Sequence, residues 1–438
     1  MTQQEHGSGV FYGVWVAILM LHVLFFSGGM GFYSYQVFVP RFEEAFGWTR
    51  FQTVVPAAVW ALMYGFSGFF VGAWIQRFGI RKVIVTATVG ATGLYMALSA
   101  VTQLWHLHVL LALLGVTTAA TTLVPAQTVI TLWFNKNRGR AMGFTLMGIG
   151  LGGMALPPLV AWLIQEVGWR GTYRVASLAI LVLTLPPVLL FLKNKPSDIG
   201  EIPDGRAAAG AEKTHVPTGI RVGRAVRSAA FWLLFFTYLL QLYVMSAINV
   251  NTTAFAEGVG YSPLIAPLFM AFAIGISVPG RFFFGWLTDR IAPQFLMAFA
   301  GLVLGCSALA LYLLVIRFGM IDYVPIWTFG ILQGTGIAAS TVVLPILVGR
   351  CFGDLEFGKI QGLVMAGFAF GVILGGPSAA KIFDTTGSYA WAFVVCGVGG
   401  AISMVLVLLV RPEALHGEFQ AAETEAAASG CPAVTAGT

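Results

Sequence analysis

The chain has 438 residues, of which 58% are hydrophobic and only 10% are charged. A soluble domain carries about 25% charged residues, so this composition excludes an ordinary soluble protein and indicates one that crosses a membrane many times. The net charge of +6 does not indicate nucleic-acid binding, because the basic residues lie in small groups between apolar runs rather than in one patch.

Apolar runs of about 20 residues, the length of a membrane-spanning helix, occur twelve times along the chain. They cover residues 11–35, 52–75, 83–102, 106–134, 141–164, 173–192, 229–256, 263–287, 294–316, 325–348, 360–382 and 390–410. The first run follows a short polar start, which predicts an uncleaved first helix rather than a signal peptide. The alternating pattern of a membrane β-barrel is absent. We therefore predict an all-α integral membrane protein with twelve transmembrane helices.

Lysine and arginine indicate the orientation. With both termini in the cytoplasm, 17 of the 24 basic residues fall in cytoplasmic segments and 6 in outer loops, and the remaining one is Arg281. Such an excess on one side predicts N- and C-termini in the cytoplasm. The expected location is a plasma membrane, in particular a bacterial inner membrane.

One long polar break divides the apolar runs into two sets. Residues 193–228 are rich in Lys, Pro, Gly and Ala and are predicted to be a cytoplasmic linker. The linker separates a six-helix half at 1–192 from a second at 229–410. Residues 411–438 end in small and acidic residues, which predicts a disordered tail.

The two halves repeat a glycine pattern. Five glycines and one proline of the first half recur in the second, each offset by 219 residues. The pairs are Gly139/Gly358, Gly143/Gly362, Gly148/Gly367, Gly152/Gly371, Pro158/Pro377 and Gly168/Gly387. A duplicated six-helix unit predicts a substrate site near the midplane where the halves meet. We predict that the glycines themselves serve close helix packing.

Arg281 is a charge inside the apolar stretch 264–290. It precedes Asp289 by eight residues, or about 12 Å along a helix, which places it at depth in a hydrocarbon core about 30 Å thick. An arginine there is tolerable only against a polar cavity or a partner. Ser277 and Gly285, one turn to either side, are small and are predicted to leave that face open. Arg281 therefore predicts an anion site, and the alternatives are a structural partner or a side chain that reaches toward the membrane surface.

Other polar residues of the spans are candidates for the same cavity. In NVNTTAF, Asn249, Asn251 and Thr252 interrupt an apolar run, and they line the cavity or bond between helices. Tyr33 is a candidate donor to a carboxylate or an aromatic residue at the membrane interface. His22 is a candidate proton relay or a core histidine, and Glu257 a proton carrier or a solvated loop charge.

Twelve spans in two parallel halves resemble the major facilitator superfamily. The loop GAWIQRFGIRK (72–82) is similar to the signature loop of that superfamily. Gly72, Arg77 and Arg81 match it, with Gly79 and Lys82, whereas Gln76 stands where the family has an aspartate. The second copy, GWLTDR (285–290), keeps Asp289 and Arg290. The resemblance implies that these residues hold the cytoplasmic helix ends together in the outward-open state, less strongly in the first copy.

Four segments resemble the monocarboxylate transporters and their bacterial oxalate–formate exchanger relatives. They are FGWTRFQ (46–52), WFNKNRGRAMG (133–143), GWRGTYR (168–174) and FDTTGSYAWAF (383–393). The resemblance assigns Arg281, in GRFFFG, to the eighth-helix arginine that pairs with the substrate carboxylate. Ser277 stands where animal members carry an aspartate, and Tyr33 lies near the position of their first-helix lysine. One intramembrane cation suits a monoanion better than a dianion.

These observations predict a proton-coupled symporter of small monocarboxylates such as lactate or pyruvate. The alternative within transport is an exchanger, or a carrier of a bulkier aromatic acid. A receptor or enzyme is disfavoured, because the sequence has no clustered metal ligands, no phosphate-binding loop and no nucleophile elbow. The expected partners are the carboxylate, protons and membrane lipid, with no cofactor, metal or nucleic acid. One chain contains a complete translocation path, so we expect a monomer.

Overall fold

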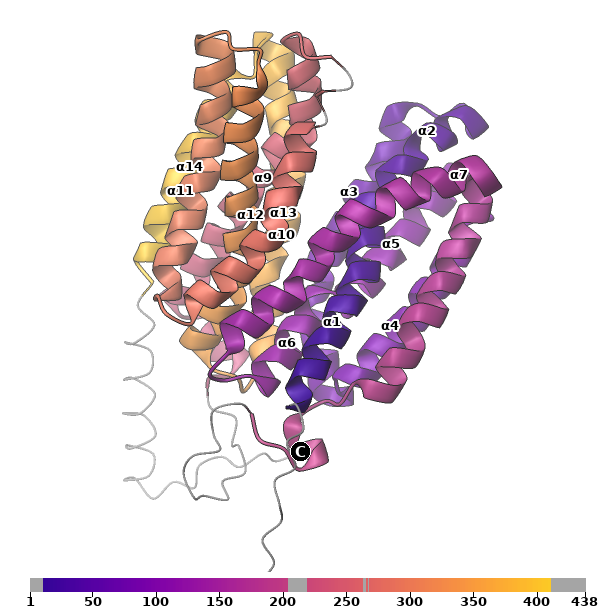
Figure 1. The fold of residues 1–438 in the computed structure, drawn as a ribbon, viewed down its shortest axis with the longest axis vertical. Helices are drawn as coiled ribbons and strands as arrows, with labels where there is room; N and C mark the ends of the chain where they lie inside the picture. The colour runs from indigo at the N-terminus through magenta and orange to yellow at the C-terminus, as the bar shows by residue number, and fades with distance from the viewer. Residues whose placement is uncertain (1–10, 204–218, 263–264, 267, 411–438) are drawn as a thin grey trace, which may run out of the picture.

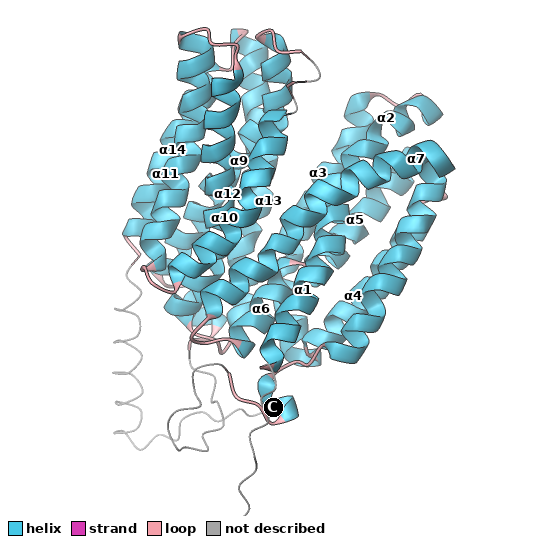
Figure 2. Cartoon of the chain, in the orientation of Figure 1, coloured by secondary structure: helices cyan, strands magenta, loops and turns pink. Residues whose placement is uncertain are grey.

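The computed structural model describes residues 11–203, 219–262, 265–266 and 268–410. Helices account for its regular structure in these residues, apart from one isolated bridge between Gly219 and Gly353 (Figure 2). The helices are α1 (Tyr12–Gly28), η1 (Gly29–Ser34), α2 (Tyr35–Phe46), α3 (Arg50–Phe78), α4 (Ile80–Leu98), α5 (Leu104–Thr121), α6 (Leu123–Trp133), α7 (Arg138–Phe191), η2 (Pro196–Ile199), α8 (Val222–Ala225), α9 (Ala229–Gly258), α10 (Leu268–Thr288), α11 (Pro293–Leu311), η3 (Tyr312–Arg317), α12 (Tyr323–Phe352), α13 (Phe357–Thr386) and α14 (Ala390–Leu408).

Ten helical segments of the described residues are long and apolar enough to cross a membrane. The longest, α7, is interrupted at Gly168, whose φ of 69° and ψ of 168° suit glycine and turn the chain back. Residues 138–167 and 169–191 are therefore two crossings. With α4, which packs against α5 and α7, this brings the number of crossings to the expected twelve.

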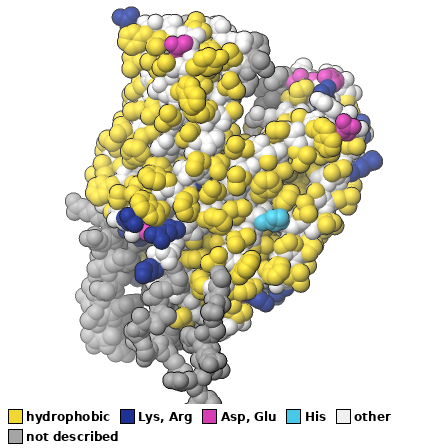
Figure 3. Space-filling model, in the orientation of Figure 1, with side chains coloured by type: hydrophobic (Ala, Val, Ile, Leu, Met, Phe, Trp, Pro, Cys, Tyr) yellow, Lys and Arg dark blue, Asp and Glu magenta, His cyan; other side chains and the backbone are white. Residues whose placement is uncertain are grey.

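The crossings form two groups, α1 to α7 and α9 to α14, which stand side by side (Figure 1). We call the end that carries the α3–α4, α10–α11 and α12–α13 turns the linker end, since residues 193–203 and 219–228 also lie there. The groups are close together at the linker end and separate toward the opposite end, which we call the open end. Hydrophobic side chains cover most of the visible surface, whereas charged side chains gather near the two ends (Figure 3). This distribution matches the hydrocarbon core and the two polar interfaces of a membrane.

The repeated glycines pack helices together, as predicted. In each copy, the first two glycines contact a helix of the opposite half and the next two contact the first helix of their own half. The first copy, on α7, places Gly139 and Gly143 on α10, and Gly148 and Gly152 on α1; the second, on α13, places Gly358 and Gly362 on α3, and Gly367 and Gly371 on α9. Backbones approach so closely that an added Cβ would meet main-chain atoms of the partner helix at most of these sites.

The second part of the linker is attached to the second half. The Ile220 amide donates to the Phe352 carbonyl at 3.1 Å, and the Val222 amide donates to Glu356 Oε2 at 2.6 Å. Ile220 is buried, as is Ala225 of the short helix α8. The first part contacts the first half, because the Arg81 amide donates to Asn194 Oδ1 at 2.9 Å. Residues 204–218 of the predicted linker and the predicted tail at 411–438 lie outside the described residues.

Candidate functional site

Arg281 is buried where α10 meets α7. Its side chain is 3% exposed, and its Nη1 donates to the Leu146 carbonyl at 3.4 Å, a long hydrogen bond. Its Nε has no hydrogen-bond partner among the described residues. Nη1 lies 2.5 Å from the position that a Cβ on Gly150 would occupy, so the guanidinium rests directly on the α7 backbone. The site therefore holds a buried cation with donor capacity left over.

Tyr33 comes from the first half and reaches the same place. It lies in η1, a π-helical turn that interrupts the first crossing, and such turns are frequent at functional sites. Its ring lies 2.6 Å from the position of a Cβ on Gly153, one turn of α7 beyond Gly150. Tyr33 lies near enough to the Arg281 guanidinium to interact with it electrostatically. The two glycines thus provide a flat face of α7 on which Arg281 and Tyr33 meet.

The neighbours of Arg281 on α10 do not leave its face open, which corrects the expectation from the sequence. Gly285 lies against Gly139 and Gly143, because α7 fills the space beside it. Ser277 is 1% exposed, and its hydroxyl donates to the Ile274 carbonyl at 2.8 Å. The small residue at 285 allows α7 to approach, and α7 occupies the space that it leaves.

The polar residues of α9 bond to neighbouring helices and to their own backbone. Asn249 Oδ1 accepts from Gln333 Nε2 at 2.8 Å, and Gln333 Oε1 accepts from the Ser307 hydroxyl at 2.7 Å. Asn251 Nδ2 donates to the Ala247 and Gly376 carbonyls, and the Thr252 hydroxyl donates to the Ile248 carbonyl. The structure records no contact of these three α9 residues with Arg281. Asn249, which is half-buried, is the one whose bonds run toward α12.

An aromatic cluster adjoins Tyr33, whose ring centre lies 6.3 Å from that of Phe32. Phe32 packs edge-on against Trp60 and Tyr64 of α3, with centroid separations of 5.2 and 5.1 Å. Tyr64 contacts Phe368 of α13 in the opposite half at 5.1 Å. The Trp60 indole N–H is buried and has no hydrogen-bond partner among the described residues. Sequence reasoning missed this cluster, because its members come from three separated segments and follow no spacing rule.

The two candidate proton carriers lie apart from Arg281 in the chain and in their contacts. The His22 Nε2 is 2.8 Å from the Leu183 carbonyl in the second segment of α7, and the ring packs edge-on against Phe26. Glu257 is exposed near the end of α9. Among the described residues, no group of three His, Cys, Asp or Glu side chains could hold a metal ion.

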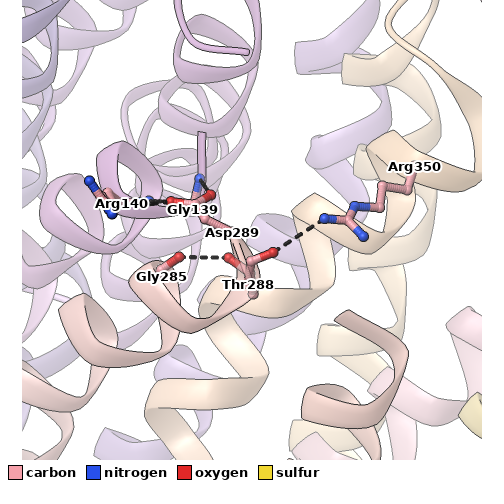
Figure 4. Close-up of polar contacts among 6 residues, drawn as sticks. All are labelled: Gly139, Arg140, Gly285, Thr288, Asp289 and Arg350. Carbon is pink, nitrogen blue, oxygen red and sulfur yellow. Dashed lines mark hydrogen bonds and ion pairs between the residues drawn. The ribbon is translucent and has the colours of Figure 1, made fainter. Parts of the chain in front are cut away.

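At the linker end, Asp289 of the second half binds the first turn of α7 (Figure 4). Its Oδ1 accepts from the Gly139 amide at 2.9 Å, and its Oδ2 accepts from the Arg140 amide at 3.3 Å. The Arg140 Nε is 3.7 Å from the same Oδ2. A carboxylate suits this position, since the first amides of a helix lack internal acceptors and carry its positive dipole end. We call this contact the α7–α10 junction.

The signature loop of the first half makes a neutral contact instead. Gln76 Nε2 donates to the Leu355 carbonyl in the α12–α13 turn at 3.1 Å, and Gly72 packs against the Gly358 backbone. We call this contact the α3–α13 junction. One cation of each loop lies beside its own helix: Arg77 stands over the Phe78 ring, and Arg290 over the Trp286 ring at 4.0 Å. Arg81 donates from its side chain to the Leu189 carbonyl.

Comparisons with known proteins agree with this architecture. A family model described as Major Facilitator Superfamily matches residues 21–324 and 315–432. Monocarboxylate transporter 13 of Bos taurus is 28% identical over 370 residues, which cover 83% of this chain and 81% of the relative. An uncharacterized MFS-type transporter of Bacillus subtilis (strain 168), YcxA, is 24% identical, with 90% and 94% covered. The crystal structure of the transporter FucP in the outward conformation aligns with a TM-score of 0.66 at 15% identity, covering 90% of this chain and 98% of that one.

Proposed function

This chain belongs to the Major Facilitator Superfamily and is a membrane transporter, and from that premise we propose that it carries a small monocarboxylate together with a proton. The location that we propose is a bacterial inner membrane, with the linker end and both termini in the cytoplasm. The excess of basic residues in segments of the linker end supports this orientation. In this orientation the open end faces outward.

One observation carries the proposal: a buried guanidinium without a recorded carboxylate partner. The ion pairs found among the described residues do not include Arg281, and its Nε has no hydrogen-bond partner. An unpaired charge in a low-dielectric site is costly, and an anion that arrives there removes that cost. A planar guanidinium offers two parallel N–H groups to a carboxylate. Tyr33 adds a neutral donor from the opposite half.

The position of the two residues supports a mechanism of alternating access. Arg281 belongs to α10 and Tyr33 to the first crossing, so a carboxylate bound to both would join the two halves. Opening the linker end requires α7 and α10 to separate, which breaks the contact between Arg281 and the Leu146 carbonyl. A carboxylate that takes over this hydrogen bond would lower the barrier to separation. Asn249, Asn251, Thr252 and Ser277 remain proposed members of the cavity in the states that follow.

Proton coupling is proposed to work through charge balance. The carboxylate neutralises Arg281, and a proton carried by the substrate or a nearby group makes the loaded site neutral. His22 and Glu257 remain candidates for a group that delivers the proton. Uptake that does not respond when the proton gradient is collapsed would contradict this part of the proposal.

The test is uptake of radiolabelled L-lactate into proteoliposomes under an inward proton gradient. We expect Arg281→Ala to lower uptake by about 10- to 150-fold, the equivalent of a charge-assisted hydrogen bond worth about 1.5–3 kcal/mol. Arg281→Lys should recover only part of it, since an ammonium lacks the planar fork. Arg317→Gln is the matched control, because Arg317 is exposed at the end of η3, outside both signature loops. Wild-type uptake that survives in Arg281→Ala would make Arg281 structural.

A second candidate function is exchange or transport of a bulkier aromatic acid. The cluster of Phe32, Trp60, Tyr64 and Phe368 favours it, because aromatic rings would pack well against such a substrate next to Tyr33. Counterflow of an aromatic acid against a preloaded anion, without L-lactate uptake, would select this alternative.

A further inference from the structure

A groove of about 410 Å³ lies between α3, α4 and α5 in the first half. The exposed rings of Trp74 and Phe78 form its rim, and aliphatic side chains with two threonines form its walls. Both threonine hydroxyls donate to carbonyls of their own helices: Thr86 to Lys82 at 2.9 Å and Thr117 to Leu114 at 3.0 Å. The walls therefore present hydrocarbon. Among the described residues that line the groove, Lys82 alone is charged.

The groove extends over one leaflet. Lys82 lies in the first turn of α4, at the linker end, whereas Thr117 lies level with Gly90, whose Cβ position is 3.3 Å from its methyl group. Eight residues of helix separate Lys82 from Gly90, or about 12 Å. Half of a hydrocarbon core is about 15 Å thick, so the groove runs from the polar interface at the linker end nearly to the midplane.

Lys82 has no cationic counterpart at the equivalent position of the second half. Lys82 follows Gly72 by ten residues, and the residue ten after the matching Gly285 is Phe295, which is 56% exposed. A second cation stands at the rim of the groove, since the Arg77 guanidinium lies 5.3 Å from the centre of the Phe78 ring. Hydrocarbon walls that end in a cationic rim match an amphiphile with an anionic head.

We propose that this groove binds one anionic phospholipid of the leaflet at the linker end. One acyl chain lies along α3, α4 and α5, and the headgroup contacts Lys82, with Arg77 beside it. Burial of the acyl chain supplies the part of the lipid affinity that does not depend on the headgroup. Each cation near an anionic headgroup adds about a fivefold preference over a zwitterionic lipid. The groove is lined by the first half alone, so this inference does not depend on the substrate.

Native mass spectrometry of the purified full-length protein tests the proposal, with dioleoyl phosphatidylglycerol and dioleoyl phosphatidylcholine as probes. We expect the wild type to retain phosphatidylglycerol about fivefold better or more. Lys82→Gln should remove most of this preference, whereas Arg290→Gln, in the other half, should preserve it. Thr86→Trp should reduce retention of both lipids, because an indole would fill the groove. Lys82 and Thr86 are exposed, and size-exclusion elution confirms that the variants fold.

Three outcomes would overturn the proposal. Equal retention of the two lipids by the wild type would show that the rim does not select an anionic head. An unchanged preference in Lys82→Gln would place the selective contact elsewhere. Full retention by Thr86→Trp would show that the acyl chain does not occupy the groove.

Discussion

The α7–α10 and α3–α13 junctions are built from equivalent helices of a duplicated unit, yet they hold the halves together differently. Both bring glycines against glycines: Gly139 against Gly285, and Gly72 against Gly358. The first adds a carboxylate, Asp289, on the amides that begin α7. The second has the neutral Gln76 on a carbonyl.

The first turn of α13 does have an acid, but from its own half. Glu356 precedes the helix, and its Oε1 accepts from Lys359 Nζ at 2.8 Å while its Oε2 accepts from the Val222 amide of the linker. The recorded bonds of this carboxylate thus remain within the second half. Duplication preserved the steric contact at both junctions, whereas a charge crosses between the halves at the α7–α10 junction. Closure at the linker end should therefore depend on both junctions sterically and on one of them electrostatically.

The largest expected effect comes from breaking the steric contact that the junctions share. A Cβ at Gly139 would collide with the Gly285 carbonyl, and one at Gly72 with the Gly358 carbonyl. Overpacking costs about 1–3 kcal/mol, so Gly139→Val and Gly72→Val should each shift the equilibrium toward an open linker end by about 5- to 150-fold. Double electron–electron resonance measures this shift as a change in the distance between spin labels at positions 82 and 295. Gly93→Val, where a Cβ has nothing within 4 Å, should leave the distance unchanged.

Removing the charge should produce a smaller shift, at one junction only. Asp289→Asn keeps the shape but replaces charge-assisted hydrogen bonds by neutral ones, a difference of about 1 kcal/mol. We expect about a fivefold shift toward the open linker end, measured by the same spin-label distance. Loss of the Arg140 ion pair contributes to this weakening of the junction. High salt should reduce the wild-type population with a closed linker end only modestly, because the Asp289 side chain is 15% exposed. An unchanged spin-label distance in Asp289→Asn would show that the charge of Asp289 does not contribute to closure of the linker end.

Gln76→Ala is the counterpart at the α3–α13 junction. It removes one exposed hydrogen bond between neutral groups, worth about 0.5 kcal/mol, so a shift of about twofold is expected. A shift as large as that of Asp289→Asn would show that the two junctions are equivalent after all.

The smallest effect is a pH dependence at the start of α13. Partial burial raises the pKa of Glu356, but hydrogen bonds from Lys359 and the Val222 amide outweigh it and hold the pKa below its usual value. The linker contact is therefore fully present above the ordinary pKa and is lost as pH falls through the lowered one. Hydrogen exchange, corrected for intrinsic rates, should show weaker protection of the Val222 amide near pH 3.5 than near pH 7. In Glu356→Gln, protection should be weak at both, and a wild-type acid response in this variant would contradict the assignment.

The sequence predicted the crossings well, because burial in lipid demands long apolar runs and little else. It predicted the end of the first crossing less well. That helix continues past residue 35 to Phe46 as α2, whose polar residues Arg41 and Glu44 pair with each other at 2.9 Å. A hydropathy pattern cannot show that a polar helix extends beyond the apolar run.

Less of the candidate site followed from the sequence. Arg281 was identifiable because a charge in an apolar span is rare, whereas Tyr33 was one of several polar candidates. The face that joins them, Gly150 and Gly153, was visible only as part of a glycine-rich helix. The aromatic cluster around Phe32 depends on how separated helices pack, which no local pattern specifies.

The attachment of the linker has a consequence at the level of the gene. Asn194 is bonded to the first half, and Ile220 and Val222 are bonded to the second. The attachment of the linker therefore changes from one half to the other between Asn194 and Ile220. A break introduced there would leave each product with its own docked end and its own six crossings. Two separately translated polypeptides, meeting in one membrane, would then carry all the contacts needed to reassemble the carrier.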